Sequence, residues 1–195
     1  GVDAEMPQDD QGTYVPLPDS EQQTLRAWFA AGMPLPGEAE AGTKPARVRP
    51  PFVDEEVWIR AILQDLDGLG KADQVQARYF TMGHLYNDGA GETGLAAQRL
   101  GLTKLLYSLS WAPETRPLKL LGTGNAIARI LLRDLDWDAA KWDRILAVPN
   151  NYFVRHGLDE EGLIEQRTGT PVAYVRSDWF VFHAAQPPLY HELLA

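Results

Sequence analysis

The stretch GLAAQRLGLTKLLYSL, residues 94–109, decides the fold class. Its larger apolar residues recur at helical spacing and form one broad face; these are Leu95, Leu102, Leu105, Leu106 and Leu109. Such a face is stable only when other elements cover it. The stretch therefore predicts a helix that packs into the core of a mainly helical domain.

Other segments extend this prediction in both directions. The stretch DEEVWIRAILQDL, residues 54–66, predicts a helix capped by Asp54. Further helices are predicted over 71–86, from Asp136 or Asp138 to Leu146, and from Ser177 to Ala185. Residues 125–134 alternate in part and favour a strand, with a helix as the alternative, and 172–175 favour a brief strand. Residues 158–165 are expected to form an exposed turn or a short helix. The fold class expected is mainly α, an irregular helical domain with a few short strands.

The N-terminal part has a different pattern. Residues 19–31 predict a single helix with an apolar stripe at Leu25, Trp28 and Phe29, ended by Gly32 and Pro34. A proline-rich stretch over 33–51 is the best candidate for a linker. We therefore expect a small module with its linker over 1–44 and a helical domain over 45–195.

Composition excludes several classes of protein. The chain has 195 residues, 45% hydrophobic and 23% charged, with a net charge of -9. Residues 1–43 hold eight acidic residues and one basic residue, so that region carries -7. This acidity disfavours nucleic-acid binding, and it indicates either a solvated surface or attraction to a basic partner. No apolar run approaches the roughly 18 residues of a membrane span, and the absence of cysteine excludes disulfides and thiol catalysis.

Met6 and His84 are the candidates for ligand chemistry. Met6-Pro7 offers a thioether, which is a suitable axial ligand for haem iron, although an ordinary loop methionine is the alternative. His84 lies among aromatic residues, which suits either a buried histidine that packs helices or a haem contact or second ligand. The four histidines show no metal-binding spacing.

Motifs for enzymatic chemistry are missing. The acids at 134, 136 and 138 fail the pattern of a calcium loop, and ion pairing with Arg129 and Arg133 or helix capping explains them better. The sequence contains no G-x-S-x-G motif, complete dinucleotide fingerprint or P-loop lysine. The sequence therefore contains no catalytic constellation; a role other than catalysis is favoured, and the question of an enzyme stays open.

Two stretches together resemble a known family. Residues 17–34 resemble the end of the planctomycete-type cytochrome c domain, a Met-Pro loop followed by a closing helix; the matching residues are Leu17, Glu21, Leu25, Trp28, Phe29, Gly32, Met33 and Pro34. Residues 78–194 are similar to an uncharacterised region that follows such cytochromes in large secreted bacterial proteins. The matching sequence segments include Arg78-Tyr79-Phe80-Thr81, His84-Leu85-Tyr86-Asn87, Ser108-Leu109-Ser110-Trp111, Asp178-Trp179-Phe180 and Pro187-Pro188-Leu189-Tyr190-His191.

This resemblance implies a periplasmic or secreted c-type cytochrome that transfers electrons. It implies Met6 as the haem-iron ligand. We expect Trp28 and His84 as further cofactor-binding residues. Because the chain lacks a C-x-x-C-H site, haem c would be attached elsewhere, either in the haem-bearing remainder of the same protein or in a partner subunit. The helical domain would then act as a scaffold for the haem module. A haem-free interaction subunit of a larger extracytoplasmic assembly is the alternative.

Overall fold

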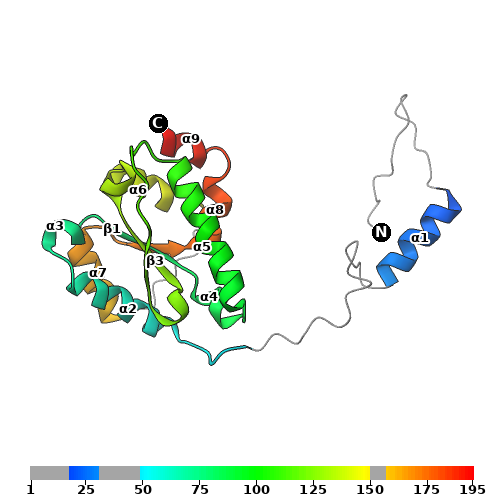
Figure 1. The fold of residues 1–195 in the computed structure, drawn as a ribbon, viewed down its shortest axis with the longest axis horizontal. Helices are drawn as coiled ribbons and strands as arrows, with labels where there is room; N and C mark the ends of the chain where they lie inside the picture. The colour runs from blue at the N-terminus through cyan, green and yellow to red at the C-terminus, as the bar shows by residue number, and fades with distance from the viewer. Residues whose placement is uncertain (1–17, 31–48, 150–156) are drawn as a thin grey trace. The chain divides into compact units, whose positions relative to one another are not determined.

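The computed structural model describes residues 18–30, 49–149 and 157–195 (Figure 1). The chain separates into two units, Gly1–Ala46 and Arg47–Ala195. In the first unit, the predicted N-terminal helix is present as α1 (Asp19–Ala30). The second unit is built on a four-stranded sheet.

The sheet has the strand order β2-β3-β1-β4. Its strands are β1 (Ala77–Thr81), β2 (Lys119–Leu121), β3 (Ile127–Leu131) and β4 (Tyr174–Arg176). Strand β3 pairs antiparallel with both β1 and β2, whereas β1 and β4 run parallel. The carboxyl ends of β1 and β4 therefore meet at the same edge of the sheet.

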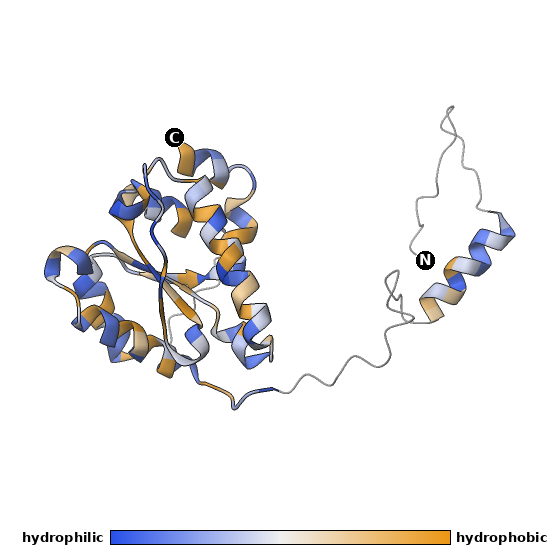
Figure 2. Ribbon diagram, in the orientation of Figure 1, coloured by the Kyte–Doolittle hydropathy of each residue, from blue (hydrophilic) through white to orange (hydrophobic). Residues whose placement is uncertain are grey.

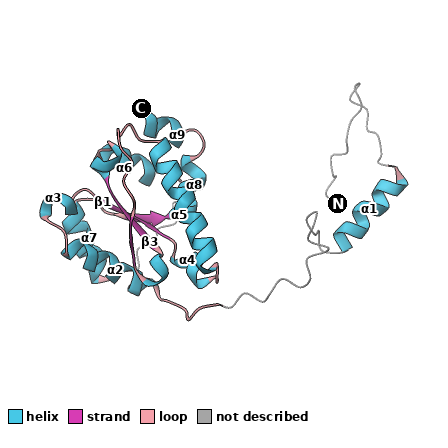
Figure 3. Cartoon of the chain, in the orientation of Figure 1, coloured by secondary structure: helices cyan, strands magenta, loops and turns pink. Residues whose placement is uncertain are grey.

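Helices cover both faces of this sheet (Figure 1). One face is covered by α2 (Glu55–Asp67), α3 (Lys71–Gln74) and α7 (Asp159–Thr168). The other is covered by α5 (Gly91–Ser108), α6 (Ala139–Leu146), α8 (Ser177–Ala184) and α9 (Leu189–Leu194), while α4 (Gly83–Asn87) follows β1 directly. Helix predominates over strand (Figure 3), so the predicted mainly helical class with a few short strands is confirmed.

The core is aromatic on the α6 and α8 side of the sheet. Phe80 of β1 packs against Trp142 and Phe180, with ring centroids 5.9 Å and 4.8 Å away. In the hydropathy colouring of Figure 2, hydrophobic residues occur along the strands and along parts of the helices, and many of them belong to the buried core. Burial of these large side chains supplies the main driving force for folding.

A second aromatic pair lies where helix α2 packs against helix α4. Trp58 of α2 meets Tyr86 of α4 edge to face, with centroids 5.9 Å apart. The pair packs so closely on the backbone that a Cβ at Gly83 would lie 2.5 Å from Trp58 Nε1. Only glycine fits at this position without displacing the indole.

The predicted helix over 71–86 is wrong. The chain forms the short α3, then β1, then the short α4. Every residue of β1 is buried, because helices cover the sheet on both faces. A strand of this kind shows no polar alternation, so its periodicity does not distinguish it from a helix.

Most other predicted elements are present. The structure has α2, α5, α6 and α8 as helices and β3 and β4 as strands, close to the predicted ranges, and the predicted turn or short helix near 158–165 is the helix α7. The predicted ion pairs of Arg129 and Arg133 with Asp134, Asp136 and Asp138 are wrong, since Arg129 pairs with Asp65 and Arg133 with Asp73. The capping prediction is right for Asp138, whose Oδ1 accepts a hydrogen bond from Lys141 N. Within the described ranges, no helix has the length and hydrophobicity needed to cross a bilayer.

Candidate functional site

The carboxyl edge of the parallel pair β1 and β4 brings together residues far apart in the sequence. His84 lies in α4, just after β1, and Asp178 lies in α8, just after β4. Arg176 is the last residue of β4. In sheets with helices on both faces, ligands bind preferentially beyond the carboxyl ends of parallel strands. We therefore take these three residues as the candidate site and call them the His84 cluster.

Asp178 is the centre of the His84 cluster. Its Oδ2 lies 3.1 Å from Nε2 of His84. Arg176 donates from Nε to Oδ1 at 3.1 Å and from Nη2 to Oδ2 at 2.5 Å. The three side chains are partly buried, each about one third exposed or less.

The charges of the cluster favour an ionised carboxylate. Burial alone would raise the pKa of Asp178, but its contacts with His84 and Arg176 hold that pKa well below its usual range. Asp178 is therefore charged throughout the physiological range. The ionised carboxylate therefore lies between a guanidinium and an imidazole, 3.1 Å from Nε2 of His84.

The adjacent serine supports the structure of this edge. Ser177 is fully buried, and its Oγ accepts a hydrogen bond from Gln98 Nε2 at 3.2 Å. This contact joins the first residue of α8 to α5. Among the residues with described positions, no hydroxyl or amine side chain is hydrogen-bonded to His84. Within the described residues, no side-chain hydroxyl or amine is therefore placed as a nucleophile that His84 could activate.

Of the three residues expected at a haem, the structure describes two. Met6 lies outside the described residues. Trp28 lies on α1, where its ring packs on Phe29 with centroids 5.4 Å apart. His84 lies in the second unit, and its Nε2 faces Asp178. A haem ligand at His84 would therefore have to use Nδ1 or give up this contact.

The described residues show no metal centre of their own. Over 18–30, 49–149 and 157–195, no three His, Asp or Glu side chains lie close enough together to hold a metal ion.

A second polar cluster lies between the sheet and helices α2 and α7. One row of cross-strand neighbours carries the polar side chains Lys119, Arg129, Tyr79 and Tyr174. Tyr79 donates its hydroxyl hydrogen to Asp65 of α2 at 2.8 Å, and Tyr174 donates to Glu161 of α7 at 2.9 Å. Burial and the Asp65 carboxylate raise the pKa of Tyr79, so its hydroxyl remains a donor. These bonds fasten both helices to the sheet, which is a structural role.

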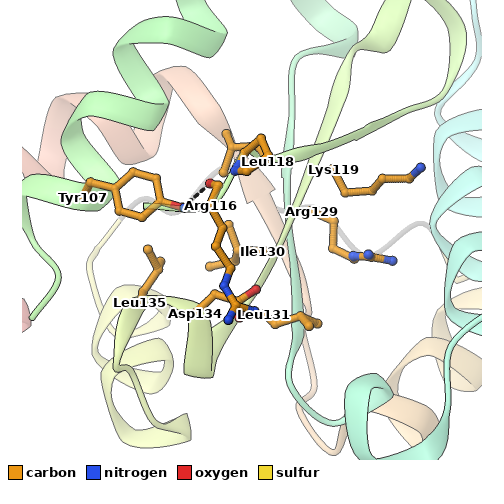
Figure 4. A pocket seen from close by; sticks show the side chains of 10 residues that line it. Tyr107, Arg116, Leu118, Lys119, Arg129, Ile130, Leu131, Asp134 and Leu135 are labelled. Atoms are coloured by element: carbon orange, nitrogen blue, oxygen red, sulfur yellow. Dashed lines mark hydrogen bonds and ion pairs between the residues drawn. The ribbon is translucent and has the colours of Figure 1, made fainter. Parts of the chain in front are cut away.

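A small pocket lies where β2 and β3 lead into their neighbouring loops (Figure 4). The hydroxyl of Tyr107 is hydrogen-bonded to the backbone of Arg116, and the side chain of Arg116 reaches Asp134 at 3.1 Å. The pocket has a volume of about 70 Å³, whereas small-molecule sites usually measure roughly 300 to 1,000 Å³. The polar groups that line this pocket make hydrogen bonds to one another, so we interpret the pocket as a packing feature.

Comparisons with protein-family models, with curated proteins and with solved structures found no match to this chain.

Asp178 and Arg176 are the site residues that sequence reasoning missed. Asp178 belongs to the segment Asp178-Trp179-Phe180, which was quoted for the family resemblance. Nothing in the local sequence links it to His84. The usable signal is that His84 and Asp178 each lie within three residues of the end of a short strand. It becomes informative only once β1 and β4 are known to be parallel neighbours.

Proposed function

We propose that this chain is part of an extracytoplasmic c-type cytochrome that transfers electrons. In this proposal α1 closes a haem-bearing module, and the domain after the linker is a scaffold for that module. The observation that carries the proposal is the apolar stripe of α1, a helix in which no residue is buried.

The stripe consists of Leu25, Trp28 and Phe29. These side chains are between 39% and 60% exposed, and no side chain of α1 is buried. A single helix of 12 residues is marginally stable in water, and most helices depend on packing of their apolar face. The stripe therefore suits a helix that belongs to a core completed by other residues, as the closing helix of a cytochrome c domain would.

Haem attachment in this proposal requires residues outside the given sequence. The chain has no cysteine, so a partner or the remainder of the protein would supply the C-x-x-C-H site. Met6 would then offer its thioether to the iron, and methionine ligation raises the haem potential. Trp28 would pack near the cofactor, and His84 would contribute as a contact of the scaffold.

The experiment uses the complete gene product that contains this chain. We expect a Soret absorption band and covalently bound haem after denaturing electrophoresis. Met6→Ala should lower the haem midpoint potential, whereas Met33→Ala, which alters another methionine followed by proline, should leave it unchanged. Absence of haem overturns the proposal, and an unchanged potential in Met6→Ala removes Met6 as the ligand.

A haem-free interaction subunit is the second candidate. It is favoured by exposed aromatic side chains on the second unit, since Trp111 is 68% exposed and Phe182 65%. Large aromatic residues are enriched in protein interfaces. If the complete gene product carries no haem, Trp111→Ser and Phe182→Ser should weaken its assembly with other subunits, as measured by size-exclusion chromatography with light scattering.

A further inference from the structure

A pocket lies where the ends of helices α6 and α8 meet helix α9. Its volume is about 390 Å³, which falls within the roughly 300 to 1,000 Å³ of small-molecule sites. None of the residues that line it belongs to the His84 cluster. The pocket is therefore a separate place on the second unit, and its size suits a small ligand.

The wall of this pocket is apolar. Val148 follows α6, Pro187 and Pro188 join α8 to α9, and Leu189 is the first residue of α9. Leu189 belongs to the buried core, and Val148 packs against that core. A wall held in place in this way can bind the hydrocarbon part of a ligand.

Two oppositely charged side chains also line the pocket, Arg144 of α6 and Glu192 of α9. Nη1 of Arg144 donates to the backbone oxygen of Glu192 at 2.7 Å, which fixes the guanidinium beside the pocket. Among the residues that the structure describes, neither charged group forms an ion pair, with the other or with a third residue. The remaining guanidinium hydrogens and the carboxylate are therefore available to a ligand.

His183 of α8 adds an uncharged polar group to the lining when its imidazole is neutral. Its ring contacts those of Trp179 and Phe182, with centroids 5.0 Å and 5.1 Å away. These contacts restrict the ring to one place at the pocket. A ring nitrogen there can accept a hydrogen bond from an ammonium group or donate one to a carboxylate.

The combination of one cation, one anion and an apolar wall selects the ligand class. A ligand that carries only a carboxylate would bind Arg144 but would lie close to the like charge of Glu192. A ligand that carries only an ammonium group would meet the opposite problem. A zwitterion pairs both groups at once, and its apolar part is then left to contact the wall.

We propose that this pocket binds a free α-amino acid with an aliphatic side chain. Arg144 binds the carboxylate of the ligand, Glu192 binds its ammonium group, and Val148 and Leu189 contact its side chain. The proposal does not depend on haem.

The test is an NMR titration of the full chain with L-leucine at pH 7 and constant ionic strength. We expect the backbone amide resonances of Val148 and Leu189 to shift and saturate. Two matched probes separate the charges: 4-methylpentanoate is leucine without the amino group, and 3-methylbutylamine is leucine without the carboxyl group. Each should bind about tenfold more weakly than leucine or less tightly still, because one hydrogen-bonded charge is lost.

Substitutions assign the two charges to their residues. Arg144→Gln and Glu192→Gln should each weaken leucine binding by about tenfold or more. Glu192→Gln keeps the backbone oxygen that Arg144 binds, so it changes the charge without removing that contact. Arg133→Gln, at an exposed arginine paired with Asp73, should bind leucine as the wild type does.

Three results would overturn the proposal. Leucine that produces no saturating shifts at Val148 and Leu189 removes the site. Either single-charge probe binding as tightly as leucine removes the zwitterion as the ligand class. If Arg144→Gln does not fold, Glu192→Gln decides, and unchanged leucine binding in that variant removes the assigned role of the carboxylate and with it the proposal.

Discussion

The carboxylate of Asp65 binds the guanidinium of Arg129 through two contacts, at 2.9 Å and 2.8 Å, and so joins helix α2 to strand β3. The two side chains are only 13% and 16% exposed. The same carboxylate accepts the hydroxyl hydrogen of Tyr79 from the central strand. One acidic residue therefore determines how α2 lies on two strands of the sheet.

Arg129→Met should destabilise the second unit strongly. The substitution leaves Asp65 buried and uncompensated, and breaking a buried pair from one side costs about 3 to 5 kcal/mol. Urea unfolding followed by tryptophan fluorescence measures the loss. Arg60→Met is the control, because Arg60 is 61% exposed and solvent screens its surface ion pairs. Equal losses in the two variants would show that the Asp65 contact does not stabilise the fold.

Gly83→Ala and Gly101→Ala should have opposite effects. A Cβ at Gly83 would lie 2.5 Å from Trp58 Nε1, so the indole must move, and overpacking of this kind costs about 1 to 3 kcal/mol. A Cβ at Gly101 meets nothing within 4 Å. Because Gly101 lies inside α5, alanine there should stabilise by about 0.5 to 1 kcal/mol. Differential scanning calorimetry of both variants checks the sign, and a stabilised Gly83→Ala would contradict the close packing on Trp58.

The comparison of sequence and structure shows where local patterns are sufficient. Helix α5 buries Leu95, Leu102 and Leu106 at helical spacing, so its sequence predicts it directly. Strand β1 is buried on both sides, and its five residues carry no period that marks a strand. Strand β2 has only three residues, and its pairing with β3 defines it. Strands β1 and β2 depend on neighbours that are distant in sequence, so the local sequence pattern does not predict them.

The residues of the candidate site also differ in whether their local sequence reveals them. His84 could be selected from the sequence, because histidine is rare in this chain and this one lies in an aromatic run. Its partner Asp178 could not, because their contact depends on the parallel pairing of β1 with β4. Pairing between distant strands leaves no mark in either local segment.

The two predicted helix caps should differ in strength. Asp138 accepts a hydrogen bond from Lys141 N at 2.9 Å, whereas Asp54 makes no side-chain cap bond. Asp138→Ala should therefore cost about 1 kcal/mol. Asp54→Ala should stay within about 0.5 kcal/mol of the wild type. Urea midpoints measured side by side test this difference, and a larger loss at Asp54 would mean that its side chain caps α2 in solution.

Asp178→Asn should remove a pH-dependent part of the stability. Because the folded state depresses the pKa of Asp178, ionisation of this group stabilises the fold at pH values above the unfolded pKa of about 3.9. That contribution declines as the pH falls towards the folded pKa. Asp178 is 36% exposed, so solvent screening limits the effect to about 1 kcal/mol. Wild type should therefore exceed Asp178→Asn in unfolding free energy at pH 7, and the difference should shrink below about pH 4. Asp88→Asn serves as the control for a general change in charge. A difference between wild type and Asp178→Asn that stays constant from pH 7 to pH 3 would show that the contacts with His84 and Arg176 do not bind the ionised carboxylate preferentially, and the His84 cluster would then lose its electrostatic basis.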